Sequence, residues 1–561
     1  MNEIDRDAVS RALNYPDFYW LPEQFSFSIP TADSRWEGYG TAEPLSAQYA
    51  LLSPSQATSF RQALNAWDEL IDPDFTEVSD PHVGKVRVAF TDMAIVYGSS
   101  NVWGYAYLPG YRGSPSAEAG DLWISAQFAS TSFTPGSFNY YALLHELGHA
   151  LGLRHPFEGA TALPRELTTL RHSVLSYQLP KDATVWTFSL GETGKFLASP
   201  FLVYPTTPML LDALAIAAKY GPDTATATVD NVYHWSESEP LLQTLVDAGG
   251  HDVIDLSDHS RGAIINLEPG TYSSIALYPA TEQQRDWSKL LPEAAGLIAE
   301  TFARGDAYEW RDNLAIAFDT LIEDVIAGSG NDTVQGNGAD NHLRGGSGND
   351  HLHGGAGRDQ LEGGPGNDIL QGGPGDDLLD GGAGVDEARF SVPRSNVLLM
   401  SAANGEIVIN FQSGEADIAR QIEILRFDDA LLVLVYEEVA GPLVHGLYHM
   451  AFARPPDETG FFYWQDQARE ANLSAGDLVD IFAASPEFAA RSLSDDHSNF
   501  IDGLYRNGLG RDPDMEGKIF WQSYLDAGTL NRAEVLESFL ISSEFHQFRA
   551  AQHDLGLWLA L

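Results

Sequence analysis

The chain of 561 residues contains no cysteine, which excludes disulfide bonds, thiolate zinc sites and thiol catalysis. Basic residues are scarce: 32 lysines and arginines stand against 79 aspartates and glutamates, which gives a formal charge of -47. This imbalance excludes nucleic acid and anionic membrane as main partners, because both are polyanions. Bound cations suit such a chain better.

Long hydrophobic runs are also missing, since no apolar stretch reaches the ~18 residues of a transmembrane helix. The N-terminus has no basic start followed by an apolar run, so we expect no secretory signal peptide. With 44% hydrophobic residues the chain is nevertheless globular, and its length predicts three or four domains. These signs alone are compatible with a cytoplasmic protein, an interpretation that the repeats described below reverse.

Composition and periodicity predict a multidomain protein with three regions. Residues 1–228 have the mixed pattern of an α/β domain, with expected helices at 55–70 and 138–151 and expected strands at 85–90 and 120–126. Residues 229–435 are rich in glycine and aspartate, as is typical of strands and turns. Residues 436–561 have helical periodicity and contain two copies of a 57-residue repeat, so we expect an all-α domain.

The sequence between His145 and His155, HELGHALGLRH, predicts a catalytic zinc site. On a helix, His145 and His149 lie one turn apart on one face and can bind the same ion. Gly152 can take a positive φ and turn the chain, so that His155 supplies a third nitrogen. Three histidines leave one zinc position open for water, whose proton Glu146 is placed to accept. The alternative is three surface histidines, but chance produces this extended motif with an expectation on the order of 10⁻⁵ to 10⁻⁴.

A nine-residue unit, Gly-Gly-x-Gly-x-Asp-x-Leu-x, recurs between residues 328 and 386 and predicts bound calcium. Its glycines permit tight turns that expose carbonyl oxygens, each aspartate projects a carboxylate, and the apolar residue points inward. Stacked turns would form a parallel β-roll whose folding depends on Ca²⁺. The alternative is a flexible low-complexity linker. The expected ligands are Gly328, Gly330, Asp332, Gly346, Gly348, Asp350, Gly355, Gly357, Asp359, Gly364, Gly366, Asp368, Gly373, Gly375 and Asp377.

The zinc motif, the following Pro156 and the segment from His172 to Tyr177 resemble the serralysin family of metzincin metalloproteases. The resemblance implies an α/β metzincin protease domain in which Tyr177 is an additional zinc ligand and stabilises the transition state. Residues 104–110 and 121–124 also resemble serralysin segments. The second is similar to the edge strand that binds substrate, which implies a substrate-binding role for Leu122, Trp123 and Ile124.

One position departs from the family: Leu175 stands where serralysins have the methionine beneath the zinc ligands. That methionine forms an apolar floor and does not bind zinc. Leucine and methionine have similar volumes, so the change should cost less than about 1.5 kcal/mol. We therefore expect zinc binding and catalysis to be retained.

The repeat region resembles the RTX domain that follows the protease domain in serralysins, and residues 386–434 resemble its β cap. The resemblance implies further calcium ligands, which are Asp247, Gly249, Asp252, Glu323, Asn337, Ala339 and Asn341. The helical tail resembles repeats of undefined function in secreted and S-layer-associated bacterial proteins. Tethering to a cell-surface or S-layer protein through residues 436–561 is therefore our hypothesis for the tail.

Together these patterns predict a secreted, zinc-dependent endopeptidase that acts on proteins and is stabilised by calcium. Free calcium inside cells is too low to load weak sites, so the roll should fold outside. RTX proteins are typically exported by type I secretion machinery through an uncleaved C-terminal signal. Two alternatives remain: a calcium-dependent adhesion module with a vestigial protease domain, and a narrow processing protease for a surface-layer protein.

Overall fold

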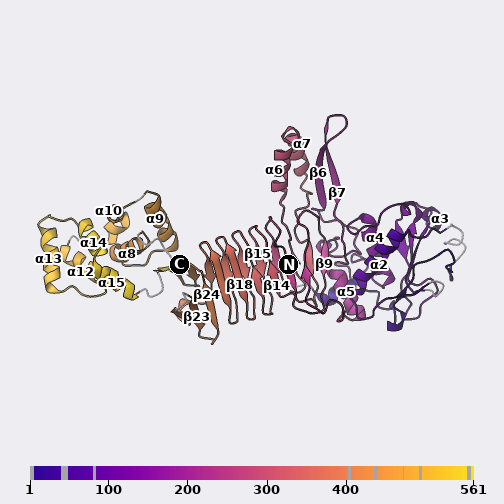
Figure 1. Cartoon of the computed structure of the whole chain (residues 1–561), viewed down its shortest axis with the longest axis horizontal. Coiled ribbons are helices and arrows are strands. Elements are labelled where there is room, and N and C mark those ends of the chain that lie inside the picture. Colours follow the sequence, from indigo (N-terminus) through magenta and orange to yellow (C-terminus); the bar gives the residue numbers. More distant parts are fainter. Residues whose placement is uncertain are drawn as a thin grey trace. The chain divides into compact units, whose positions relative to one another are not determined.

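The computed structural model describes residues 5–39, 49–79, 84–401, 406–434, 440–471, 473–491, 496–552 and 557–560. The chain forms two compact parts, residues 1–338 and 339–561, which are described separately (Figure 1). The division at residues 228 and 435 stays a prediction. Among the described residues, no helix is both long and apolar enough to span a bilayer.

The N-terminal α/β region is built around a three-stranded sheet in the order β3–β5–β4. Strands β3 (Arg87–Thr91) and β5 (Asp121–Ser125) are parallel, and β4 (Gly104–Ala106) is antiparallel at the edge. Helices α2 (Pro54–Asp68) and α4 (Phe138–Ala150) pack together, and the Trp67 indole N–H donates to the carbonyl of Leu144 at 3.1 Å. Both helices lie within two residues of the ranges that the sequence predicts at 55–70 and 138–151. The remaining elements are α1 (Arg6–Leu13), α3 (Met93–Val96), α5 (Leu210–Tyr220) and the β1–β2 pair (Ser26–Phe27, Thr76–Glu77).

A hairpin and a helix pair project together from the first part of the chain (Figure 1). The hairpin consists of β6 (Thr184–Leu190) and β7 (Phe196–Leu202), and the helices are α6 (Ala280–Leu290) and α7 (Ala295–Phe302). Trp186 and Phe188 pack against Ile298 and Phe302 in a shared hydrophobic cluster. The two helices lie in a segment for which the sequence predicts only strands and turns.

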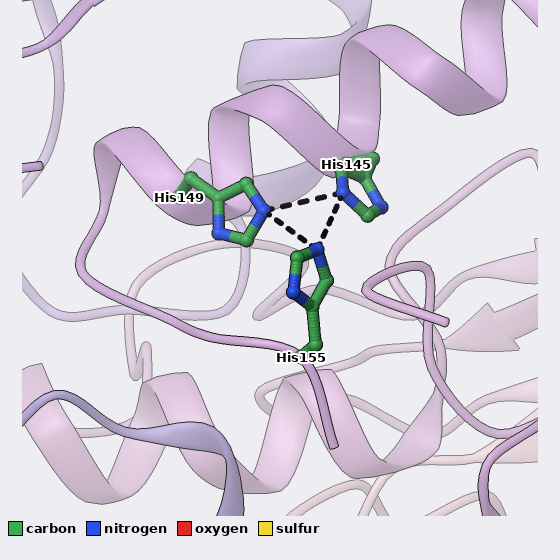
Figure 2. Close-up of side chains that lie close together, drawn as sticks. All are labelled: His145, His149 and His155. Atoms are coloured by element: carbon green, nitrogen blue, oxygen red, sulfur yellow. Dashed lines mark hydrogen bonds between the residues drawn. The ribbon is translucent and has the colours of Figure 1, made fainter. Parts of the chain in front are cut away.

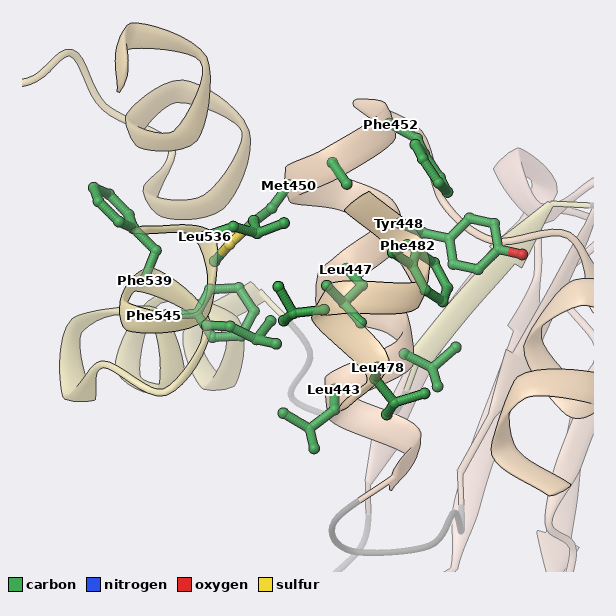
Figure 3. Close-up of a cluster of buried hydrophobic side chains, with 14 of the residues drawn as sticks. Leu443, Leu447, Tyr448, Met450, Phe452, Leu478, Phe482, Leu536, Phe539 and Phe545 are labelled. Atoms are coloured by element: carbon green, nitrogen blue, oxygen red, sulfur yellow. The ribbon is translucent and has the colours of Figure 1, made fainter. Parts of the chain in front are cut away.

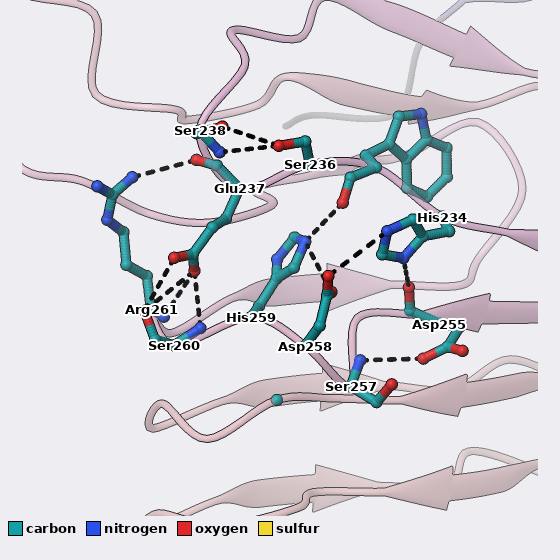
Figure 4. A network of polar contacts seen from close by, with 12 residues as sticks. His234, Ser236, Glu237, Ser238, Asp255, Ser257, Asp258, His259, Ser260 and Arg261 are labelled. Atoms are coloured by element: carbon teal, nitrogen blue, oxygen red, sulfur yellow. Dashed lines mark hydrogen bonds and ion pairs between the residues drawn. The ribbon is translucent and has the colours of Figure 1, made fainter.

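Short strands complete the first part. Strand β10 pairs in parallel with β8 and β14, β11 pairs with β15, and β13 pairs with β9 and β12. A polar network holds the segment from His234 to Arg261, in which the Nε2 atom of the buried His259 lies 2.7 Å from the carbonyl oxygen of Trp235 (Figure 4). The strand bounds are Val232–Tyr233 (β8), Gln243–Leu245 (β9), Val253–Asp255 (β10), Ile264–Asn266 (β11), Tyr272–Ser273 (β12), Leu314–Ile316 (β13), Asp324–Ile326 (β14) and Thr333–Gln335 (β15).

The second part begins with two parallel sheets whose strands alternate along the sequence. One sheet pairs β16, β18, β20 and β24, and the other pairs β17, β19, β21 and β25. The leucine of each nine-residue unit is fully buried between the sheets: Leu343, Leu352, Leu361, Leu370 and Leu379. The strand bounds are His342–Arg344 (β16), His351–His353 (β17), Gln360–Pro365 (β18), Ile369–Gln371 (β19), Leu378–Ala383 (β20), Glu387–Arg389 (β21), Ala416–Arg420 (β24) and Ile424–Arg426 (β25).

Antiparallel strands extend both sheets at residues 397–433. Strands β22 (Val397–Ser401) and β23 (Ile407–Phe411) continue one sheet beyond β24. Strand β26 (Ala430–Val433) continues the other, and the C-terminal β27 (Leu557–Ala560) pairs with β26.

The helical tail is a duplicated unit with a single hydrophobic core, to which Leu447, Phe482, Leu536 and Phe539 contribute (Figure 3). Each copy repeats one ion pair, Arg454 with Glu487 at 3.0 Å and Arg511 with Glu544 at 2.6 Å. The helices of the two copies are α8 (Ala440–Phe452), α9 (Glu458–Glu470), α10 (Ala475–Ala483) and α11 (Pro486–Arg491), then α12 (His497–Leu509), α13 (Met515–Asp526), α14 (Arg532–Leu540) and α15 (Ser543–Gln552).

Candidate metal centres

Three histidines converge at the end of α4, as the motif predicts. His145 and His149 lie on the last turns of the helix, and Gly152, with φ at 87°, reverses the chain toward His155. The three Nε2 atoms form a triangle with sides of 3.2, 3.2 and 3.3 Å (Figure 2). Within the described residues this is the one group of three or more histidine and carboxylate ligand atoms that all lie within 4.8 Å of one another.

The second nitrogen of each ring has an acceptor that fixes its orientation. His145 Nδ1 lies 2.8 Å from the Val174 carbonyl oxygen, and His149 Nδ1 lies 2.9 Å from that of Leu153. His155 Nδ1 lies 2.6 Å from a carboxylate oxygen of Glu158. With Nδ1–H donating outward, each Nε2 lone pair points into the triangle.

The triangle fits zinc. Two nitrogen ligands at 2.0–2.1 Å from a tetrahedral Zn²⁺ lie about 3.3 Å apart, which is the separation found here. Burial and the neighbouring imidazoles hold the pKa of His145 well below its usual value and lower that of His149 to about 4, so both rings are neutral ligands at pH 7. Three nitrogen ligands leave a fourth position for water or substrate.

Glu146 and Tyr177 flank the histidines. Burial raises the pKa of Glu146 to about 8, and a zinc ion held by the adjacent histidines would lower it again, because a nearby cation favours the carboxylate form. The Tyr177 hydroxyl lies 2.7 Å from His155 Nε2, and desolvation together with the carboxylates of Glu146 and Glu158 raises its pKa to about 12. Tyr177 therefore remains a hydrogen-bond donor at pH 7.

The loop beneath the histidines carries Leu175, which is fully buried. Its side chain lies under Gly148, where a Cβ atom would come within 2.8 Å of a Leu175 methyl group. Asp212 of α5 fixes this loop, since its carboxylate accepts from the Ser173 hydroxyl at 2.6 Å, the Val174 amide at 2.6 Å and the Met209 amide at 2.9 Å. Because Val174 also accepts from His145, Asp212 orients a histidine of the triangle indirectly.

The prediction that residues 121–124 form the substrate-binding edge strand is wrong. Leu122, Trp123 and Ile124 belong to β5, which lies between β3 and β4, and all three are fully buried. Asp121 of the same strand forms a buried ion pair with Arg87 of β3, with 2.7 Å between Nε and Oδ1. Among the described strands, the edges of this sheet are β3 and β4 instead.

The aspartates of the nine-residue units form two ladders in the second part of the chain. In each ladder, the backbone N–H of one residue donates to the carboxylate of the residue 18 positions ahead, at 2.8–2.9 Å. One ladder runs from Asn341 through Asp359 to Asp377, and the other runs from Asp350 through Asp368 to Asp386. The turns stack so closely that a Cβ atom at Gly366 (φ 156°) would overlap the carbonyl oxygen of Gly348. Gly346, Gly355, Gly357, Gly364, Gly373 and Gly375 lie in the same stacked turns, also with positive φ, and Ala339 has its carbonyl oxygen against Gly357.

These ladders fit calcium because they retain unused carboxylate oxygens. The Oδ2 atoms of Asp359, Asp368, Asp377 and Asp386 are buried without a hydrogen-bond partner. Desolvation raises the pKa of Asp359 and Asp368 to about 6 and that of Asp377 to about 7. A buried, unsatisfied carboxylate is costly unless a cation binds it, and oxygen is the ligand that Ca²⁺ prefers.

Both ladders end at residues that sequence reasoning missed. Asp377 donates to Asp417 at 3.0 Å, and Asp386 donates to Glu423 at 2.8 Å. Desolvation raises the pKa of Asp417 to about 8. Because these acceptors lie 40 and 37 residues ahead instead of 18, the repeat period could not reveal them.

The predicted ligands of the first part lie close together as well. The Asp252 amide donates to Glu323 at 2.8 Å, and one Asp252 oxygen is buried without a partner. Asp247 accepts from the amide of Gly249 at 2.8 Å and also from Tyr233. The Asp332 carboxylate accepts from the Gly328 amide at 3.2 Å, and the backbone of Gly330 approaches that of Gly262. The Asn337 side chain donates to the carbonyl of Ile322 at 2.8 Å.

Comparison with known proteins agrees with both kinds of site. Residues 45–182 match the family model described as matrixin, and residues 326–361 and 353–388 match the RTX calcium-binding nonapeptide repeat. The chain is similar in sequence to several proteins named serralysin. It is 26% identical over 374 residues to serralysin of Proteus mirabilis, covering 61% of this chain and 66% of that protein. The matrixin domain and this similarity imply a catalytic zinc, and the RTX repeats imply bound calcium.

Two further relatives are a serralysin and a metalloprotease. The chain is 31% identical to serralysin A of Dickeya chrysanthemi, covering 51% of this chain and 53% of that protein, and 28% identical to metalloprotease AprA of Pseudomonas entomophila, covering 61% and 64%. The chain thus spans about half to two thirds of these relatives' lengths.

Two further matches do not help to assign a function. Residues 479–548 match a domain of unknown function, DUF4214. The solved structure of extracellular lipase LipA from Serratia marcescens is 22% identical over 20% of this chain and 18% of that one, with a TM-score of 0.12, which is too low to support an inference.

Proposed function

We propose that this protein is a secreted metalloendopeptidase that uses zinc at His145, His149 and His155. The observation that carries the proposal is the triangle of Nε2 atoms, whose sides of 3.2–3.3 Å match tetrahedral zinc while each Nδ1 is hydrogen-bonded outward. A bound zinc ion would supply a Lewis acid and an activated water there.

Two residues of this chain perform the proton and charge chemistry. Glu146, beside the first histidine, accepts the proton of the attacking water and returns it to the leaving amine. Tyr177, which could serve as an additional zinc ligand at rest, would donate a hydrogen bond from its hydroxyl to the developing oxyanion of the peptide and keep its proton. The raised pKa of Tyr177 keeps that proton in place at neutral pH.

Substrate binds along β4 in this proposal, as an added antiparallel strand. Strand β4 is an edge strand of its sheet, and a Cβ atom at Gly104 would lie 3.7 Å from Cγ of Glu146, so the strand passes beside the general base. A cavity of about 410 Å³ lies next to Tyr177, lined by Phe157 and Leu163 among others. It is placed to accept a substrate side chain.

The remaining regions serve stability and location. We propose that residues 229–435 form a calcium-loaded parallel β-roll with a β cap, in which the unused oxygens of Asp359, Asp368, Asp377 and Asp386 bind Ca²⁺. Export through type I secretion machinery, and tethering to a cell-surface or S-layer protein through residues 436–561, are the accompanying proposals. Fusing 436–561 to a reporter tests the tethering, which lack of retention on cells or S-layer material would exclude.

A single substitution tests the catalytic proposal. Glu146→Ala should abolish cleavage of casein while the purified chain keeps one zinc per molecule, because Glu146 is not a ligand. Glu192→Ala, an exposed glutamate in the β6–β7 turn, is the matched control and should cleave normally. Turnover by Glu146→Ala, or cleavage that persists in a zinc chelator, would refute the proposal. Absence of cleavage by the unsubstituted chain would favour a vestigial protease domain.

A further inference from the structure

A cavity of about 400 Å³ lies on the outer face of the second parallel sheet, and none of its lining residues is assigned to zinc. Its floor is formed by outward-facing side chains of adjacent strands, among them Gln371 of β19 and Arg389 of β21. Its wall comes from the end of β23 and the turn after it, including Phe411 and Gln412. A volume of this size is typical of small-molecule sites.

The apolar side of the cavity is formed by the rings of Phe390 and Phe411. Phe390 is almost fully buried and stacks on Phe427 with centroids 5.3 Å apart, while the Phe411 ring lies 5.9 Å from Phe390 and is only half-buried. Phe390 is thus locked by packing, and Phe411 presents ring surface to an occupant.

The polar side is rich in carboxamides with unused hydrogen-bonding capacity. Gln371 donates to the Ser391 hydroxyl at 3.4 Å, Gln412 donates to the Ser395 carbonyl at 3.2 Å, and Asn396 accepts from the Ser395 hydroxyl at 3.3 Å. Each contact is long, and a carboxamide has two donors and two acceptor lone pairs. The suitable occupant therefore carries groups that both donate and accept.

Charge excludes an anionic occupant. Arg389 is already paired with Glu387 at 2.5 Å, and burial lowers the pKa of His353, so neither supplies a free positive charge at pH 7. Glu415 adds a carboxylate to the lining. A purely apolar occupant fits no better, since it would bury the carboxamides without partners.

We infer that this cavity binds a neutral saccharide, whose C–H faces stack on Phe411 while its hydroxyl groups pair with Gln371, Asn396 and Gln412. Hydroxyl groups both donate and accept, as the carboxamides require. The site is independent of the proposed peptidase chemistry.

The cavity also borders a calcium ladder. Gly373 and Pro374 of its lining belong to the stacked turns, and strand β24, which follows the Glu415 turn, carries Asp417 at the end of the same ladder. Saccharide binding should therefore require calcium.

Isothermal titration of the full Glu146→Ala chain, which avoids self-digestion, tests the inference with maltose, cellobiose, lactose and N,N′-diacetylchitobiose. At about 10 mM sugar, a site with a Kd near 1 mM would be almost saturated. At least one sugar should bind in calcium and none in EDTA. Phe411→Ala and Gln412→Leu should each weaken binding at least tenfold, whereas Leu398→Ala, an exposed residue of β22 outside the cavity lining, should not.

Gln412 is exposed, so its variant keeps the test valid if Phe411→Ala disturbs folding. Absence of binding by all four sugars in calcium would overturn the inference. Binding that is unchanged in both variants, or binding of the dipeptide glycyl-leucine in place of the sugars, would overturn it as well.

Discussion

Asp212 offers the sharpest test of how the fold positions the histidines. Its buried carboxylate accepts hydrogen bonds from Ser173, Val174 and Met209. In Asp212→Ala, three buried donors lose their acceptor, at about 1–3 kcal/mol each. The opposing term is the cost of burying the Asp212 charge. Burial raises the pKa of Asp212 from about 3.9 in the unfolded chain to about 7, and this shift corresponds to about 4 kcal/mol. The three donors together cost about 3–9 kcal/mol, so at the middle of that range the net loss of unfolding free energy should be about 2 kcal/mol.

The effect on zinc distinguishes positioning from simple destabilisation. Val174 accepts from His145, so displacement of its loop should weaken zinc binding about 10–100-fold, as removal of such supporting partners typically does. Chelator competition measures the zinc affinity, and urea unfolding measures the stability. Ser173→Ala is the matched control, because it removes one donor and should cost about 1 kcal/mol with near-normal zinc affinity. Wild-type zinc affinity in a destabilised Asp212→Ala would refute the reasoning.

Three further predictions concern the floor of the zinc site and the calcium ladders. Leu175→Met should change the unfolding free energy by less than about 1.5 kcal/mol and peptidase activity only modestly, and a gain of orders of magnitude would show that the turn has been misread. In EDTA, without calcium, the free energy of unfolding should fall as pH rises from about 4 to about 8. The pKa is raised to about 7 for Asp377 and to about 8 for Asp417, so the folded state holds protons that the unfolded chain releases. Greater stability at pH 8 than at pH 5 would contradict this. Asp417→Asn and Glu423→Gln should each lower the number of calcium ions bound in equilibrium dialysis, whereas the exposed Asp428→Asn should not, and unchanged stoichiometry would remove both residues from the ligand set.

Local patterns allowed the sequence to predict α4, its end at Gly152 and the three histidines, because their geometry depends on one helix and one turn. The ladder aspartates were equally accessible, since an 18-residue spacing follows from a nine-residue unit. Asp417 and Glu423 were not, because strands β24 and β25 bring them to the ladders from outside the repeat.

The error at β5 has a different origin. Whether a strand lies at an edge depends on the order of strands in the finished sheet, which a resemblance of short segments does not encode. The unbroken apolar run of Leu122, Trp123 and Ile124 was nevertheless a usable signal, since strands covered on both faces lack polar alternation. Helices α6 and α7 were hidden for another reason: the average composition of residues 229–435 masked a short segment with helical periodicity.

The alternation of strands between two sheets has a consequence for how this protein can change length. Each nine-residue unit contributes a strand to one sheet, and its partner in that sheet lies 18 residues away. Removing one unit would send every later strand, together with Asp417 and Glu423, to the opposite sheet relative to the strands before the deletion. Removing two adjacent units would shorten the stack by one full turn and leave each remaining residue facing its former neighbours. Gains and losses that preserve this fold should therefore come in steps of 18 residues.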